Sequence, residues 1–292
     1  MVKIAVIGDV HTHFDDADVA FFNQSDFDLI LFVGDLANYR FMEGITVARK
    51  MAQLEKTAVF IPGNHDTVTP LQMLATIRKS PFLKKITSFF HPFRINWLRR
   101  TMSPVMMGGY QTFSFDIQGL TFDVVTGRPF SWGENMLANP HYLNSQFGIQ
   151  TTQYSIKRLK ECVDGTRSNN LIFLAHTGPH GLSKTRSDIW GIDYKKSEGD
   201  NGDIDLEEAI THAKAQGKKV WAVVAGHMHH RLKKEGYRET YRLEDGTHYI
   251  NAARVPRIFE ENNQMHHHFV AVTLANRTLS AEPQAHISPK IE

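Results

Sequence analysis

Cysteine is almost absent from this chain of 292 residues, and its single copy is Cys162. One cysteine excludes a framework of disulfides within the chain and suits a reducing, cytoplasmic compartment. Long apolar runs are also missing, since none approaches the roughly 20 residues that a membrane-spanning helix needs. The opening run Val2–Ile7 is too short for the core of a signal peptide and is soon followed by Asp9. We therefore expect a soluble, cytoplasmic protein that has no membrane partner.

Charge of one sign is scarce as well. The chain has 33 Lys and Arg against 31 Asp and Glu, a formal net charge of +2. This excess is too small to indicate a nucleic-acid partner. Hydrophobic residues make up 41% and charged residues 22%, which is typical of a soluble globular protein with a substantial core. The composition says nothing firm about oligomeric state.

The first part of the chain alternates strand and helix signals. Continuous apolar runs at Val2–Ile7, Leu29–Val33 and Ala58–Ile61 are typical of strands buried on both faces. Helical stretches at Phe14–Asn23 and Met42–Glu55 separate them, the first with Asp residues near its start. This order predicts parallel strands joined by right-handed crossovers.

The rest of the chain contains signals for further strands and helices. Gln118-Gly119 and Glu244-Asp245-Gly246 are predicted to be the turns of two β-hairpins. The expected strands are Tyr110–Ile117, Leu120–Val125, Leu171–Ala175, Val220–Ala225, Tyr237–Leu243, Thr247–Asn251 and Phe269–Leu274, and the expected helices are Leu71–Lys79, Thr151–Cys162 and Ile204–Gln216. The succession predicts an α/β fold of four layers, an α/β/β/α sandwich of two mixed sheets flanked by helices. We expect one domain over residues 1–275, with an insertion around 67–170, and a polar C-terminal tail over 276–292.

Five short segments carry oxygen or imidazole ligands at the carboxyl ends of apolar runs. They are Gly8-Asp9-Val10-His11, Gly34-Asp35, Gly63-Asn64-His65-Asp66, His176 and Gly226-His227-Met228-His229. Oxygen and nitrogen donors without a thiolate suit Mn²⁺, Fe²⁺/Fe³⁺ or Zn²⁺ rather than copper(I) or an iron–sulfur cluster. Donors delivered by several strand ends are what a two-metal hydrolytic site requires.

Each segment also has an ordinary structural interpretation when taken alone. A Gly-Asp pair commonly marks a strand end and a turn, and a lone His on an apolar run is commonly a core residue. Taken together and in this order, the five segments favour a metal site. The triplet His266–His268 is different, because consecutive residues on a strand point to alternate faces and cannot converge on one ion. We interpret it as structural or surface.

The order Asp-x-His, Gly-Asp, Gly-Asn-His-Asp, His, Gly-His-x-His, spanning Gly8 to His229, resembles the calcineurin-like metallophosphoesterase superfamily. The resemblance implies two divalent metal ions (Mn, Fe or Zn) that share one carboxylate and generate a hydroxide that attacks a phosphoester. It assigns one metal to Asp9, His11, Asp35 and His229, and the second to Asp35, Asn64, His176 and His227. It also implies that His65 stands beside the metals without ligating them, as a general acid or as a donor to the phosphoryl oxygens, and that Asp66 orients and charge-tunes His65.

Two motifs differ from better-known relatives. Thr12 follows His11 where the family often has glycine, which indicates an altered rim of the site. The segment Gly34–Arg40 lacks the Gly-Asp-x-Val-Asp-Arg-Gly motif of protein Ser/Thr phosphatases and is more similar to the phosphodiesterase-type branch. The loops Ala175–Leu182 and Arg128–Gly133 resemble an uncharacterised subgroup common in cyanobacteria and plastids.

The sequence therefore predicts hydrolysis of a phosphodiester or phosphomonoester of a small molecule, with a nucleotide as one option. A nuclease of the same superfamily and a noncatalytic metal-binding scaffold are the alternatives, and the complete ligand set argues against the scaffold. Candidate substrate contacts are Arg40, Arg128, His180 and Arg254, with surface or ion-pair roles equally consistent for each. The stretch Thr177–Asp203 could be a lid whose Trp190 and Tyr194 stack on a base, or a mobile surface loop.

Overall fold

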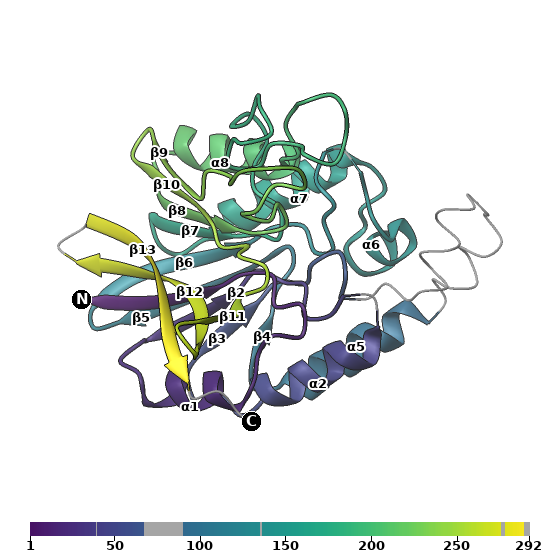
Figure 1. The fold of residues 1–292 in the computed structure, drawn as a ribbon. Helices are drawn as coiled ribbons and strands as arrows, with labels where there is room; N and C mark the ends of the chain where they lie inside the picture. The colour runs from purple at the N-terminus through teal and green to yellow at the C-terminus, as the bar shows by residue number, and fades with distance from the viewer. Residues whose placement is uncertain (39, 67–89, 135, 276–277, 289–292) are drawn as a thin grey trace.

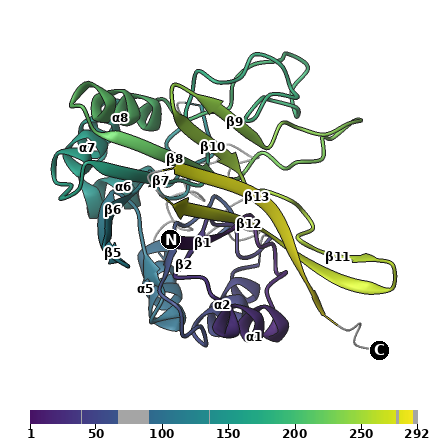
Figure 2. The ribbon, with the colours of Figure 1, turned by 90° about the vertical axis from the view of Figure 1, so that its left-hand side faces the viewer.

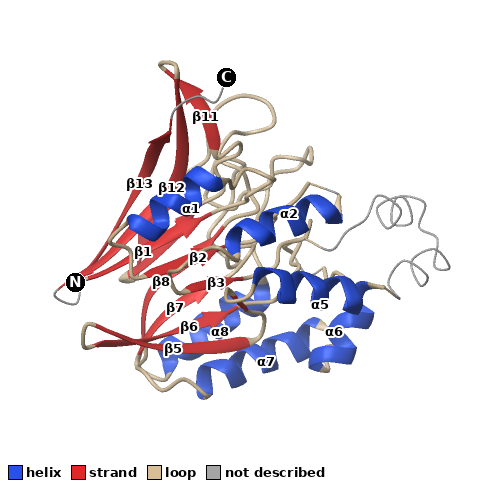
Figure 3. Cartoon of the chain, turned by 90° about the horizontal axis from the view of Figure 1, so that it is seen from below, coloured by secondary structure: helices blue, strands red, loops and turns tan. Residues whose placement is uncertain are grey.

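Two β-sheets lie face to face between outer helices in the computed structural model (Figure 1), which describes residues 1–38, 40–66, 90–134, 136–275 and 278–288. Figure 3 shows the strands in the middle, with α1 and α2 on one outer side and α7 on the other. The described helices are α1 (Asp16–Gln24), α2 (Phe41–Met51), α5 (His91–Met102), α6 (Pro140–Phe147), α7 (Thr152–Asp164) and α8 (Ile204–Ala215). The four-layer α/β/β/α sandwich of two mixed sheets predicted from the sequence is confirmed.

The first sheet has the strand order β11-β12-β1-β2-β3-β4, with β13 paired to β12. Its strands are β1 (Val2–Ile7), β2 (Leu29–Phe32), β3 (Ala58–Phe60), β4 (Met106–Met107), β11 (Ile258–Glu261), β12 (Gln264–Ala275) and β13 (Thr278–Ser288). Strands β1 to β4 pair in parallel, as the β-α-β-α-β order predicts, and the C-terminal strands join antiparallel. The carboxyl ends of β1, β2 and β3 therefore meet at one edge.

The second sheet has the strand order β5-β6-β7-β8-β10-β9. Its strands are β5 (Gln111–Ile117), β6 (Leu120–Thr126), β7 (Asn170–Leu174), β8 (Lys219–Ala225), β9 (Tyr241–Glu244) and β10 (Thr247–Asn251). The turn residues Gln118 and Gly119 have φ of 53° and 76°, and Asp245 and Gly246 have 49° and 70°. Positive φ at both central residues is the type I′ geometry that matches strand twist, so both predicted hairpins are confirmed.

The core has a layer between the sheets and further layers under the helices. Val2, Ile4 and Val6 of β1 pack in the layer between the sheets, whereas Ala5 and Ile7 pack towards the helices. Successive side chains of a strand alternate between faces, so a strand covered on both sides needs an unbroken apolar run. Each large apolar side chain removed from water contributes about 1.5–3 kcal/mol.

Helix α1 begins where the Asp-rich stretch predicts. The Asp15 side chain accepts hydrogen bonds from the backbone N–H groups of Ala17 and Asp18, and the Asp18 side chain accepts one from the Asp15 N–H. This reciprocal capping satisfies amides that a helix start leaves without partners. The cap fixes the entry of the chain into α1 directly after the Asp9–His11 loop.

The C-terminal region corrects the sequence prediction. Strand β12 begins at Gln264 rather than Phe269, and most of the expected polar tail forms β13, paired along its length with β12 (Figure 2). The residues of β13 do not show a typical strand pattern, because an edge strand can expose polar side chains and contain a residue such as Pro283. Strands β5 and β6, within the expected insertion, belong to the second sheet.

Several other predictions have different outcomes. The expected helix Leu71–Lys79 lies outside the described residues, and α5, α6, β4 and β11 were not predicted. Cys162 is buried in α7, as expected. In the part of the chain that the structure describes, no helix has the length and apolar character needed to cross a membrane.

Candidate metal centre

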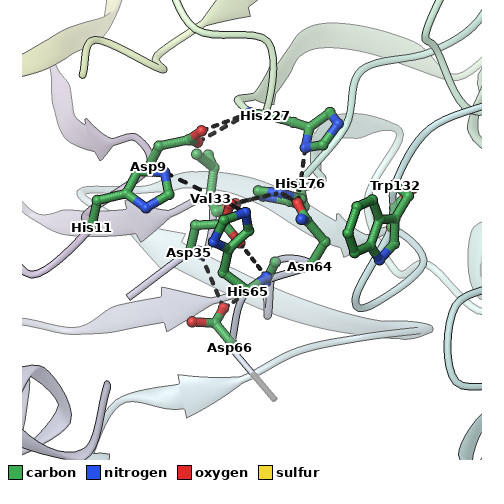
Figure 4. Close-up of polar contacts among 12 residues, drawn as sticks. Asp9, His11, Val33, Asp35, Asn64, His65, Asp66, Trp132, His176 and His227 are labelled. Atoms are coloured by element: carbon green, nitrogen blue, oxygen red, sulfur yellow. Dashed lines mark hydrogen bonds and ion pairs between the residues drawn. The ribbon is translucent and has the colours of Figure 1, made fainter. Parts of the chain in front are cut away.

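The five ligand segments meet at one edge of the sandwich. Asp9 and His11 follow β1, Asp35 follows β2 and Asn64 follows β3, while His176 follows β7 and both His227 and His229 follow β8. Figure 4 shows side chains from both sheets converging there. The carboxyl ends of parallel strands are where open α/β sheets commonly bind ligands. The structure thus brings together all seven residues predicted to ligate metal.

The backbone is strained at these strand ends. Asp9, His11, Asp35 and His227 all have positive φ, at 22°, 42°, 54° and 66°. Non-glycine residues seldom adopt this region, and such strain concentrates at functional sites. Thr12, at φ 71°, occupies the position where relatives often have glycine. The chain therefore places a β-branched residue in a backbone conformation that favours glycine, at a cost in strain.

One group of donor atoms comes from Asp9, His11 and His229. The Nε2 atom of His229 lies 3.2 Å from Asp9 Oδ2 and 3.3 Å from His11 Nε2. Donor atoms of these three residues all lie within 4.8 Å of one another, close enough to ligate one ion. The His229 side chain is 40% exposed, so this group is open to solvent.

A second group comes from Asp35, His176 and His227, with Asn64 beside them. Asn64 Oδ1 lies 2.8 Å from His176 Nε2 and 2.9 Å from His227 Nδ1. His176 Nδ1 lies 2.6 Å from the Val33 carbonyl oxygen, and because a carbonyl only accepts, Nδ1 carries the proton. The lone pair of His176 Nε2 is then directed into the group, as metal-ligating histidines are commonly oriented.

Asp35 lies between the two groups. Its Oδ2 atom is 3.5 Å from His176 Nε2 and 3.9 Å from His11 Nε2, so one carboxylate reaches both sets. The donors are oxygen and nitrogen throughout, which fits Mn²⁺, Fe²⁺ or Zn²⁺. A buried, shared carboxylate flanked by imidazoles fits a pair of divalent cations.

Electrostatics favour the ligand forms of Asp9, Asp35, His11 and His227, whereas the carboxylates of Asp9 and Asp35 raise the pKa of His176 and His229 against the effect of burial. Burial alone would raise the pKa of Asp9 and Asp35, but the surrounding imidazoles hold both below the ordinary value, so both are anionic. Burial lowers the pKa of His11, and together with the charge of His176 it lowers that of His227 to about 3. Both rings are therefore neutral and keep a lone pair for a cation.

Two glycines allow the ligands to come this close. A Cβ on Gly63 would lie 2.3 Å from Asp35 Oδ1 and 2.7 Å from His176 Cε1. A Cβ on Gly226 would lie 2.2 Å from Asp9 Oδ1. Any larger residue would have to displace a donor, which explains why these two motifs begin with glycine.

His65 stands beside the groups with its ring facing the shared carboxylate. Its Nε2 atom lies 4.0 Å from Asp35 Oδ2, and its Nδ1 atom faces the backbone carbonyl of Asn38. The ring also lies edge-on to His11, with centroids 5.1 Å apart. His65 therefore reaches the centre from its rim, where its side chain is 16% exposed.

Asp66 occupies a different place from the one expected. Its carboxylate accepts hydrogen bonds from the N–H groups of Asp35 (3.0 Å), Leu36 (2.6 Å) and Gly63 (2.6 Å). Burial, followed by the charge of Asp35, raises its pKa to about 7. These contacts are with the backbone, so Asp66 ties the second and third motifs together, and its predicted effect on His65 stays a prediction.

The family model of the calcineurin-like phosphoesterases matches residues 2–270. The chain belongs to the calcineurin-like phosphoesterase family. Membership confirms the resemblance seen in the motifs and supports metal-dependent phosphoester hydrolysis as the general chemistry of this site. A comparison with curated proteins finds no match.

Several solved structures are similar to this phosphoesterase-family chain. One crystal structure, 12% identical in sequence, aligns over 96% of this chain and 98% of its own with a TM-score of 0.51. A hypothetical protein from Pyrococcus horikoshii OT3, also 12% identical, covers 98% of this chain and 88% of its own, with a TM-score of 0.37. Vacuolar protein sorting 29 from Cryptosporidium parvum is 8% identical, covers 98% of each chain and has a TM-score of 0.31.

Among the candidate substrate contacts in this phosphoesterase-family chain, Arg128 is a correction. Its guanidinium is buried, ion-paired with Asp203 and 3.1 Å from Asp205 Oδ2. Those two carboxylates raise its pKa against the effect of burial. Arg128 is therefore engaged inside the protein, which the sequence could not show because its partners lie more than 70 residues away.

The other three candidates lie nearer the surface. The Arg40 side chain is 79% exposed and lies 3.7 Å from Glu43, and His180 Nδ1 lies 3.2 Å from Glu207. The guanidinium of Arg254 stacks on the Phe259 ring at 3.8 Å. Burial of His230 lowers the pKa of that ring, and the charge of Arg254 lowers it further. Of the three, Arg254 thus has its charge close to the residue that follows His229.

The two aromatic residues considered for stacking on a base differ in exposure, Trp190 being 0% and Tyr194 42% exposed. Trp190 is fully buried beside Tyr249, so its predicted stacking role is wrong. The hydroxyl of Tyr194 donates to Asn201 Oδ1 at 2.7 Å. Arg238 Nη1 donates to three backbone carbonyls of the same loop, those of Arg186, Asp188 and Gly191. These hydrogen bonds fix this part of the proposed lid to the rest of the protein.

The side chains of His266, His267 and His268 point to alternate faces of β12, as strand geometry predicts. His266 stacks on Phe259 and His268 lies against His230, whereas His267 stacks on His286 and lies 3.4 Å from Asp18. Donor atoms of Asp18, His267 and His286 converge. Both oxygens of Asp18, however, already accept from Arg257, at 2.7 and 2.8 Å. The guanidinium of Arg257 thus occupies the place that a metal ion would take.

Proposed function

We propose that this protein hydrolyses a small phosphoester at a dinuclear metal centre. The observation that supports this is Asp35, whose one carboxylate is shared by the donor groups Asp9–His11–His229 and Asp35–His176–His227. Two divalent cations (Mn, Fe or Zn) held there would neutralise phosphoryl oxygens and lower the pKa of the attacking water.

His65 would act as the general acid. Its Nδ1 atom faces the carbonyl of Asn38, which can only accept, so Nδ1 carries a proton and Nε2 is the atom that gains or loses one. Nε2 lies 4.0 Å from Oδ2 of the shared Asp35 carboxylate and so faces the centre. From the rim of the centre, Nε2–H then donates its proton to the departing oxygen.

The substrate that we propose is a small phosphorylated compound, either a phosphomonoester or a phosphodiester. The near-zero charge balance argues against a nucleic-acid substrate. Action in the cytoplasm, which the single cysteine suggested, stays a prediction.

The test compares a chromogenic phosphomonoester with a chromogenic diester after loading the protein with Mn²⁺, and repeats it with Fe²⁺ and Zn²⁺. Asp35→Asn serves as the blank, because it replaces the shared carboxylate by an amide of the same size. We expect metal-dependent hydrolysis of at least one ester, lost in Asp35→Asn, with circular dichroism showing that the variant folds. No metal-dependent hydrolysis of either ester with any metal would favour the noncatalytic scaffold.

A further inference from the structure

Trp132 stands next to the metal centre, although no sequence pattern assigned it there. Ser131 forms a parallel bridge with Gly63, and the Phe130 N–H donates to the Pro62 carbonyl at 2.8 Å. Because Ser131 pairs with Gly63 in a parallel bridge, the next residues, Trp132 and Asn64, also lie opposite each other. Side chains at paired positions point to the same side, so the Trp132 side chain points the same way as that of Asn64. Figure 4 shows the indole beside Asn64, at the wall of the second donor group.

Buried polar contacts hold the segment that carries this indole. The Ser131 hydroxyl donates to Asp203 at 2.8 Å and accepts from the Gly133 N–H at 3.0 Å, and Asp203 is also paired with Arg128. Gly133 has φ of 78°, and a Cβ there would lie 2.0 Å from the Asn201 carbonyl oxygen. The chain therefore turns away immediately after Trp132 and leaves its ring on a rigid support.

Core packing does not account for this tryptophan. Trp190 and Trp221 are 0% and 4% exposed and belong to the core, whereas Trp132 is only partly buried. Neither hydrophobic core cluster of the described residues includes it, and in Figure 4 the labelled side chain beside its indole is the polar ligand Asn64. A flat apolar ring kept partly in solvent beside such ligands is a surface on which another ring can stack.

We propose that Trp132 is a specificity-determining residue that stacks on a planar aromatic group of the substrate. The inference rests on the proposed function, since the phosphate of that substrate would lie at the two donor groups. The substrate class is a phosphoester of a planar alcohol, either an aryl phosphate or a nucleoside phosphate. Stacking of a base on an aromatic side chain tolerates many ring types, because each presents a π-face.

The experiment measures kcat/KM of the Mn²⁺-loaded protein for three esters: 1-naphthyl phosphate, adenosine monophosphate and glycerol phosphate. If diesters prove to be the better substrates, their methyl diesters replace them. Trp132→Ala should lower kcat/KM about 5- to 150-fold for the planar esters, mainly through KM, and leave the glycerol ester unchanged. Trp132→Phe should restore most of the loss. Trp97→Ala is the matched control, because Trp97 lies on outer helix α5 against Phe41 and Phe93.

The outcomes separate the alternatives. A loss restricted to the naphthyl or to the adenosine ester supports stacking and identifies the source of the ring. An equal loss for all three esters would show that Trp132 only supports the loop, and would overturn the proposal. If the wild-type protein hydrolyses neither these monoesters nor their methyl diesters with Mn²⁺, Fe²⁺ or Zn²⁺, the proposed function fails. Stacking is then judged by quenching of tryptophan fluorescence on adding 1-naphthyl phosphate, which Trp132→Phe should abolish and Trp97→Phe should not.

Discussion

Replacing Asp66 by Asn tests whether this carboxylate holds the metal ligands or acts on His65. The carboxylate accepts three backbone N–H groups, two of which belong to Asp35 and Gly63 in the second and third motifs. Asparagine keeps the size and one acceptor oxygen, but it turns an NH₂ group towards a backbone donor. The substitution therefore loosens the two loops without opening a cavity.

The magnitude follows from the hydrogen bonds that the substitution breaks. A hydrogen bond to a charged group contributes about 1.5–3 kcal/mol, and a buried donor left without an acceptor costs about 1–3 kcal/mol. With one or two of the three hydrogen bonds affected, we expect Asp66→Asn to lower the free energy of unfolding by about 2–5 kcal/mol. Metal affinity should fall by about 10- to 100-fold, as is usual when a residue that orients ligands is replaced.

The assay is calorimetric titration of Mn²⁺ and thermal unfolding, at about pH 8.5, where a carboxyl with a pKa of about 7 is ionised. Saturating Mn²⁺ should restore most of the turnover. The control is Asp26→Asn, which removes an exposed carboxylate paired with Lys3. If Asp66 acted on His65 instead, metal affinity and stability would be unchanged and turnover would stay low at saturating metal. That result would refute our interpretation of these hydrogen bonds.

Three further predictions concern single residues. His65→Ala should lower turnover by about 10²- to 10⁴-fold while metal content measured by mass spectrometry stays the same, and full activity would exclude the general-acid role. Gly63→Ala should weaken Mn²⁺ binding by about tenfold or more, because its Cβ would lie 2.3 Å from Asp35 Oδ1, whereas Gly199→Ala, whose Cβ would meet only a side chain at 3.6 Å, should not. The pKa of Asp18 lies well below its ordinary value of 3.8, because its guanidinium and imidazole partners outweigh burial. The stabilisation by ionised Asp18 is therefore present above pH 3.8 and is lost as the pH falls further. Asp18→Asn should make the free energy of unfolding fall less steeply with decreasing pH in acid titrations. An unchanged slope would contradict this.

Much of the fold follows from local patterns. Apolar runs such as Val2–Ile7 predict strands because burial on both faces leaves no room for alternation, and positive-φ residues such as Gln118-Gly119 predict hairpins because their twist matches the strands. Strand β13 lacks such a signal. Its polar residues become a strand because β12 offers a free edge, and that is a property of the assembled sheet.

The sequence by itself determined which residues can ligate metal, because chemical type and position after a strand are both local properties. It also determined the family, because the order of the motifs is a property of the chain. Only the tertiary structure decided what Asp66, Arg128 and Trp132 contact. Asp66 meets backbone amides about 30 residues away, Arg128 meets carboxylates of Asp203 and Asp205, and Trp132 reaches the metal centre through a bridge between Ser131 and Gly63. Such partners come together only when the two sheets pack, and no spacing along the chain encodes that distance.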